Sequence, residues 1–171
     1  MRQCTLTKII SDLGIAVAVL RLIFSENFDW RDLLIMFETI LFPIDHSRES
    51  RDATSSVIEL VKIFDSRLVL LSVVETTPTG EIAADDKMNS IEAVDRLLQS
   101  AQAVFTQAGI NAEMIEREGI PSFVICDVAD EINAHLIVMG CRGLGLTSEG
   151  VSESVTTKVI NLAPCPVLII P

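Results

Sequence analysis

The sequence has few of the residues from which metal sites and disulfide frameworks are built. Neither of its two histidines, His46 and His135, has a partner at the spacing of a metal-binding motif. No two cysteines form a C-x-x-C pair; the four are Cys4, Cys126, Cys141 and Cys165. Zinc sites and redox motifs need such spacings, and scattered thiols are typical of reducing compartments. We therefore expect no metal site, reduced cysteines and a cytoplasmic location.

Basic residues are also scarce. The chain has 13 lysines and arginines against 24 aspartates and glutamates, which gives a formal net charge of −11. Residues 1–35 hold four of each sign, so the acidic excess lies in residues 36–171. An acidic surface repels phosphate backbones, which argues against nucleic-acid binding. Any nucleotide would have to be held by local dipoles against this charge.

A long uninterrupted apolar run is missing as well. Residues 9–24 are strongly apolar, but Asp12 and Arg21 interrupt them, and a membrane span needs about 20 clean residues. No small-x-small cleavage site follows before Glu26, as a signal peptide would require. We interpret residues 1–35 as an N-terminal extension, either an appended helix or a translated leader, in preference to a membrane anchor.

The motifs of several nucleotide-dependent and hydrolytic enzymes are absent. There is no G-x-x-x-x-G-K-[ST], so a Walker A loop with its lysine is excluded. Gly143-x-Gly145 lacks the third glycine of the Rossmann spacing, and no G-x-S-x-G nucleophile elbow occurs. An H-x-G-H motif of nucleotidyl transferases is missing too. We therefore expect no dedicated catalysis, and at most slow hydrolysis of a bound nucleotide.

From residue 37 onward, short apolar runs alternate with amphipathic segments. Strands are expected at residues 39–44, 67–74, 110–117, 136–140 and 167–170, and helices at 50–65, 91–108, 119–132 and 155–162. Residues 75–89 form a polar loop of a length that is often functional. Strands that alternate with helices predict an α/β fold, a three-layer sandwich in which helices cover both faces of a five-stranded parallel sheet.

The segment from Leu136 to Pro171 carries the main functional signal. A buried strand ends at Gly140, a loop rich in glycine and serine follows, and a helix begins near Ser154. Glycines let backbone amides approach an anion, and a helix start adds unpaired N–H groups and a positive dipole end. The loop therefore predicts a phosphate site, for which the alternatives are turn geometry at the glycines and simple helix capping by Ser154.

These residues also carry a family resemblance. Gly140-x-x-Gly143, nine residues, then Glu153-Ser154 and the later APCPVLII are similar to the signature of the universal stress protein family. The nucleotide-binding branch of that family has a glycine where this chain has Glu153. The resemblance covers about residues 37–171 and implies one domain over residues 36–171 with the strand order 3-2-1-4-5. It also implies a homodimer that pairs through the last strand, Pro166–Ile170.

The resemblance further implies which residues bind an adenine nucleotide. Asp45 would accept hydrogen bonds from the ribose or the adenine amino group, or else only cap its turn through Ser47. Pro43 and Val73 would form walls around the adenine, although Val73 could equally be ordinary core. Arg142 is the only cation of the loop and would contact phosphate, or else be a free surface side chain. The full set is Pro43, Asp45, Val73, Met139, Gly140, Arg142, Gly143, Ser154 and Val155.

The sequence leaves three functions open. The first is a regulatory protein of the stress response that binds ATP or another adenine nucleotide, with or without Mg²⁺. The second is a nucleotide-free dimeric interaction module, which Glu153 favours because a carboxylate repels phosphate. The third, an enzyme that consumes ATP, lacks the lysine, the histidine motif and the metal cluster that it would need.

Overall fold

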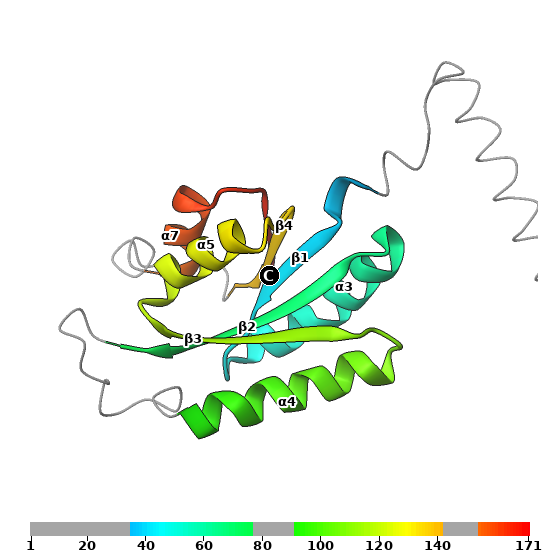
Figure 1. Ribbon diagram of the computed structural model, residues 1–171, viewed down its shortest axis with the longest axis horizontal. Coiled ribbons are helices and arrows are strands. Elements are labelled where there is room, and N and C mark those ends of the chain that lie inside the picture. Colours follow the sequence, from blue (N-terminus) through cyan, green and yellow to red (C-terminus); the bar gives the residue numbers. More distant parts are fainter. Residues whose placement is uncertain (1–34, 77–90, 142–153) are drawn as a thin grey trace, which may run out of the picture. The chain divides into compact units, whose positions relative to one another are not determined.

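Strands and helices alternate along the chain as predicted. The computed structural model describes residues 35–76, 91–141 and 154–171 (Figure 1). The expected N-terminal extension, the loop after the second strand and most of the glycine-rich loop lie outside these ranges. The elements, in chain order, are a 3₁₀ helix η1 (Ile35–Phe37), β1 (Thr39–Pro43), α3 (Arg48–Phe64), β2 (Arg67–Glu75), α4 (Ile91–Gln107), β3 (Ala112–Gly119), α5 (Pro121–Glu131), β4 (Leu136–Gly140), α7 (Val155–Leu162) and β5 (Val167–Ile170).

The five strands form one parallel sheet in the order β3-β2-β1-β4-β5. This order confirms the prediction. The central strand β1 is buried along almost its whole length, and Ile40, Leu41 and Phe42 have no exposed surface. Strands covered on both faces must be apolar on both faces, which is why the central strands appear as continuous apolar runs in the sequence.

Described helices pack against both faces of the sheet (Figure 1). On one face, α3 and α4 pack on one cluster of buried side chains, which includes the edge-to-face ring pair Phe42–Phe105 at 6.2 Å between centroids. On the other face, α5 and α7 pack on a second cluster around Leu41, Val69 and Ile137. The fold is therefore the predicted three-layer sandwich.

Several predicted boundaries shift by one or two residues; β3 ends at Gly119 rather than at Arg117, and α5 begins at Pro121 rather than at Gly119. Two other shifts have clear local reasons. Helix α3 begins at Arg48 rather than at Ser50, because Ser47 is its N-cap and the Ser47 hydroxyl accepts a hydrogen bond from the Ser50 N–H at 3.1 Å. Strand β3 begins at Ala112 rather than at Ile110. Ile110 is instead buried in the turn after α4, where its N–H donates to the Phe105 carbonyl at 2.9 Å.

The carboxyl ends of the parallel strands share one edge of the sheet, and the helices that follow them begin there. The chain leaves β1 towards β2 on one side, while β4 leads to β5 on the other. The gap between β1 and β4 is therefore a topological switch point, the usual place for a ligand crevice in this class of fold.

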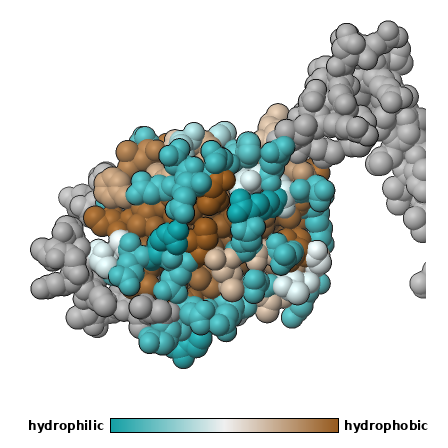
Figure 2. Space-filling model, in the orientation of Figure 1, coloured by the Kyte–Doolittle hydropathy of each residue, from teal (hydrophilic) through white to brown (hydrophobic). Residues whose placement is uncertain are grey.

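The surface carries apolar as well as charged side chains. On α5 and α7, Phe123, Ile160 and Leu162 are each about half exposed, and Figure 2 shows apolar surface over these helices. Within residues 35–76, 91–141 and 154–171, no helix combines the length and the hydropathy needed to cross a membrane.

Candidate functional site

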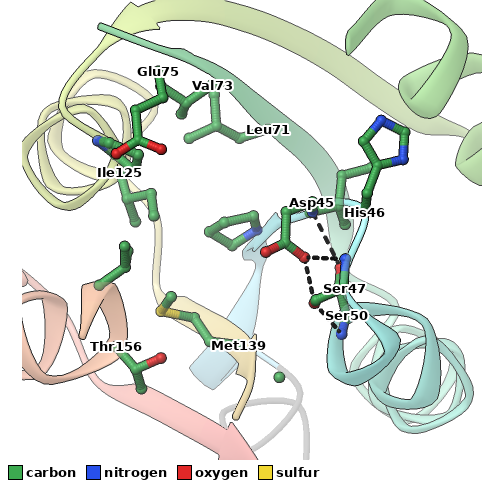
Figure 3. Close-up of a pocket in the computed structure, with 15 residues that line it drawn as sticks. Asp45, His46, Ser47, Ser50, Leu71, Val73, Glu75, Ile125, Met139 and Thr156 are labelled. Carbon is green, nitrogen blue, oxygen red and sulfur yellow. Dashed lines mark hydrogen bonds between the residues drawn. The ribbon is translucent and has the colours of Figure 1, made fainter. Parts of the chain in front are cut away.

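A cavity of about 370 Å³ opens at the switch point (Figure 3). The ends of β1, β2 and β4 and the beginnings of α3, α5 and α7 surround it. Fifteen residues line it: Pro43, Ile44, Asp45, His46, Ser47, Ser50, Leu71, Val73, Glu75, Pro121, Ile125, Met139, Gly140, Val155 and Thr156. This volume lies in the range of small-molecule sites.

One wall of the cavity is apolar. Alternate residues of a strand point to the same face of a sheet, so Leu71 and Val73 of β2 both face α5. Ile125 of α5 and Met139 of β4 belong to the same buried cluster as these two residues. Val73 is 7% exposed, so it packs in the core and lines the cavity as well. The two alternatives that the sequence left open for Val73 are therefore compatible.

A polar cluster at the start of α3 forms the facing wall (Figure 3). Asp45 Oδ1 accepts hydrogen bonds from the Ser47 N–H at 3.0 Å and from the Ser47 hydroxyl. The Asp45 N–H donates to Ser50 Oγ at 3.3 Å. The turn-capping interpretation of Asp45 is thus correct. The second carboxylate oxygen, Oδ2, has no hydrogen bond to the described part of the chain, so capping leaves an acceptor available to a ligand.

Gly140 is required by close packing. It is the last residue of β4, and the first turn of α3 crosses directly beside it. A Cβ atom at this position would overlap the backbone carbonyl of Glu49. The alternative of turn geometry is wrong, because Gly140 does not have a positive φ. Its missing side chain brings α3 and β4 together at the floor of the cavity.

Ser154 caps the helix that follows the glycine-rich loop. Its hydroxyl accepts a hydrogen bond from the Thr157 N–H at 3.1 Å, so the capping interpretation is correct here too. Val155 and Thr156, the next two residues, line the cavity, whereas Ser154 does not. The first N–H groups of a helix lack partners within the helix, so the start of α7 presents donors near the cavity.

The charges of the lining residues are negative. Asp45 and Glu75 contribute carboxylates, and none of the fifteen lining residues is a lysine or an arginine. The opposing positive potential comes from helix dipoles, because α3, α5 and α7 all begin at this cavity. Within the described ranges, no three histidine, cysteine, aspartate or glutamate side chains are grouped as a metal site would require.

Two half-buried thiols lie away from the cavity. Burial raises the pKa of the Cys126 thiol, with a further contribution from Asp127, and burial likewise raises the pKa of Cys165. A raised pKa keeps these sulfurs protonated, and a thiol is a much weaker nucleophile than a thiolate. Cys141 follows β4, and its backbone N–H donates to the Ile170 carbonyl at 2.8 Å.

Most of the predicted site residues meet in space. Pro43, Asp45, Val73, Met139, Gly140 and Val155 all line the cavity. Ser154 is adjacent to it, and Arg142, Gly143 and Glu153 lie outside the described residues.

Several lining residues were missed by sequence reasoning. Ser47, Ser50 and Thr156 belong to the first turns of their helices, and their position there was the available signal. Pro121 and Ile125 stand four residues apart on α5, and Glu75 continues the alternation of Leu71 and Val73 on β2. Periodicity shows that such residues share a face, but not that the face borders a cavity.

Comparison with known proteins agrees with this architecture. Residues 36–171 match the sequence profile of the universal stress protein family. The chain is 65% identical over 138 residues to the universal stress protein Sll1654 of Synechocystis sp., covering 81% of this chain and 88% of that protein. A crystal structure of a family member from Burkholderia pseudomallei is 29% identical, with a TM-score of 0.58 over 80% of this chain and 97% of that one.

Two further solved structures have the same fold and contain a nucleotide. A universal stress protein in complex with cAMP is 20% identical, with a TM-score of 0.64 over 80% of this chain and 98% of that one. A family protein from Arabidopsis thaliana with AMP bound is 22% identical, with a TM-score of 0.58 over 77% and 90%. The profile match and the identity to Sll1654 are decisive for membership. The chain belongs to the universal stress protein family.

Proposed function

We propose that this protein is a regulatory protein of the stress response that binds an adenine nucleotide in the cavity between β1 and β4. The observation that carries the proposal is the pairing, within one cavity, of an apolar wall with three helix N-termini. Purine rings need apolar surface, and phosphates need N–H donors and positive potential. The cAMP and AMP complexes of the two structural relatives support the choice of ligand class.

The lining residues suggest how the nucleotide lies. The base would pack between Pro43, Val73 and Ile125. The ribose hydroxyls would donate to Asp45 Oδ2. The phosphate would lie at the start of α7, where Val155 and Thr156 line the cavity and where the glycine-rich loop enters. Arg142 and Gly143 of that loop stay predicted phosphate contacts, and a cytoplasmic location stays a prediction.

Regulation rather than catalysis fits the chemistry of the described lining residues. They include one histidine, no lysine and no cysteine, and the only serines, Ser47 and Ser50, are engaged in the cap of α3. Activation of a nucleophile requires an adjacent base or a metal ion. We therefore propose binding with at most slow hydrolysis, so that the nucleotide acts as a signal.

The test is to identify a nucleotide bound to the full-length protein. Protein purified without added nucleotide would be acid-extracted, and any released nucleotide identified by mass. Calorimetric titration of stripped protein with AMP, ADP, ATP and cAMP, with and without Mg²⁺, would then give affinities. Ribose 5-phosphate serves as a matched control that lacks the base. Saturable binding of AMP together with much weaker binding of ribose 5-phosphate is expected, and no binding at millimolar concentration would disprove the proposal.

The alternative function is a nucleotide-free dimeric interaction module. Glu153, which stands directly before the N-cap Ser154, and the apolar edge strand β5 favour it. This alternative predicts a stable dimer with no extracted nucleotide and no calorimetric signal.

A further inference from the structure

Glu75 has no role in the folded chain that the described residues explain. It is the last residue of β2, its side chain is exposed, and its carboxylate lines the cavity. No hydrogen bond or ion pair joins this carboxylate to the described residues. An ionised carboxylate only accepts hydrogen bonds, and it offers about four lone-pair sites. Glu75 thus brings unused acceptors to the site.

The position of Glu75 indicates which end of a ligand it meets. Leu71, Val73 and Glu75 follow one another on the same face of β2, so Glu75 extends the apolar wall by one step towards solvent. Figure 3 shows Glu75 beside Val73 and on the opposite side of the cavity from Thr156, at the start of α7. A phosphate close to Glu75 would be repelled, so the anionic end of a ligand belongs near α7. The end that carries hydrogen-bond donors then faces Glu75.

We propose that Glu75 determines base specificity by accepting a hydrogen bond from the 6-amino group of the adenine ring. This inference rests on the nucleotide binding proposed above, and it identifies the group of the base that the site recognises. A base that presents a carbonyl oxygen at this position would meet the carboxylate with like partial charge. A base with no substituent there would leave the carboxylate without its partner. Sites built around a polar contact reject analogues that lack the matching group.

Purine riboside 5′-monophosphate, which differs from AMP only in lacking the 6-amino group, is the probe that isolates this contact. Calorimetry on the full-length protein should show that AMP binds about tenfold tighter than this analogue, the effect of one charge-assisted hydrogen bond. In Glu75→Ala the ratio should fall close to one. Glu75→Gln keeps an acceptor oxygen without the charge, so its ratio should lie between the two.

The ratio of the two affinities removes a confounding effect. Loss of a carboxylate at the cavity reduces its repulsion of every anionic nucleotide, but both ligands carry the same phosphate, so this effect cancels in the ratio. Glu118→Ala is the matched control, because Glu118 is an exposed residue of β3 that pairs in register with Val74 and does not line the cavity. Its ratio should equal that of the wild-type protein.

Different results separate the two proposals. If the wild-type protein binds AMP and the analogue equally well, or if Glu75→Ala keeps the wild-type ratio, the inference about Glu75 is wrong while nucleotide binding stands. If the wild-type protein binds neither ligand, nucleotide binding itself is wrong, and the inference falls with it. Circular dichroism of the variants verifies that each is folded.

Discussion

Gly140 at the end of β4 lies directly beside Glu49 in the first turn of α3. A Cβ atom on Gly140 would come within 2.9 Å of the Ser50 backbone nitrogen, and closer still to the Glu49 carbonyl group. Backbone atoms cannot rotate away as a side chain can, so the helix and the strand would have to separate. This contact holds the capped start of α3 against the strand from which the glycine-rich loop departs.

Gly140→Ala should therefore destabilise the fold by about 1–3 kcal/mol, the usual cost of overpacking. The free energy of unfolding in urea measures this effect. Gly109→Asn is the control, because nothing lies within 4 Å of a Cβ there and asparagine tolerates the positive φ of 83° better than other residues. Equal effects of the two substitutions would contradict the packing role of Gly140.

Asp45→Asn should weaken AMP binding about tenfold without loss of the fold. Asparagine keeps an acceptor for the Ser47 N–H, whereas alanine would remove the cap together with the ligand contact. The lost charge-assisted hydrogen bond at Oδ2 is worth about 1.5–3 kcal/mol, and partial exposure places the effect at the lower end. Calorimetry measures the change. The control variant Asp52→Asn changes an exposed residue of α3 outside the cavity, and it should bind AMP as tightly as the wild-type protein does. If Asp45→Asn also kept the wild-type affinity, Asp45 would not belong to the binding site.

Glu153→Gly should bind ATP more tightly than the wild-type protein. Two unit charges about 4 Å apart at an effective dielectric of about 20 repel by roughly 4 kcal/mol, an upper limit of about three decades in affinity. The gain should be larger for ATP than for AMP, which carries less charge. Titrations of both proteins with both nucleotides, with and without Mg²⁺, measure it. Unchanged ATP binding by the variant would instead indicate that Glu153 is remote from the phosphates. Weaker ATP binding would indicate that it is a ligand to a nucleotide-bound metal ion.

Leu168→Lys should convert a predicted two-fold dimer into monomers. Strand β5 is an edge of the sheet, and its short apolar sequence invites antiparallel pairing with a second copy. Leu168 is 36% exposed, whereas Ile169 packs against the core, so substitution at Leu168 tests pairing with less damage to the fold. Light scattering at micromolar concentration measures the mass. Val104→Lys on α4 should leave a dimer intact, and a monomeric wild-type protein would refute the assembly.

The ion pair between Arg67 and Glu113 should contribute a small, acid-sensitive stabilisation. Its two hydrogen bonds are 2.7 and 2.6 Å long, and the hydrogen bond from Arg67 holds the pKa of Glu113 below its ordinary value of 4.5. A lowered folded-state pKa stabilises the protein above about pH 4.5, and the effect disappears as pH falls through the pKa of the folded state. Both side chains are about half exposed, so we expect well under about 1 kcal/mol. A double-mutant cycle at pH 7 and at pH 3 measures the coupling, which should be smaller at the lower pH.

The sequence alone determined the layers of this fold. Continuous apolar runs at β1, β2 and β4 indicate burial on both faces, and intervening amphipathic helices supply the cover. The apolar run of β5 gave the same prediction, but that strand is an edge and only partly buried. The structure places β3, which is partly exposed, at one edge of the sheet. The order of the strands came from the family signature rather than from periodicity, because periodicity carries no information on which strands are neighbours. The start of β3 shifted because Ile110, an apolar residue expected in the strand, is buried in a turn and is not part of the strand.

The sequence also indicated which residues of the candidate site were chemically suited to it, although proline, aspartate and glycine at strand ends serve in ordinary turns as well. Only the tertiary structure decided what each of them does. Asp45 and Ser154 both cap, and this depends on the local path of the chain. Gly140 is a glycine because of Glu49, a residue far away in the sequence, and Glu75 reaches the cavity because the end of β2 meets the start of α5 there. Such contacts arise when separate elements pack, and a single sequence records the residue types but not the neighbours that folding gives them.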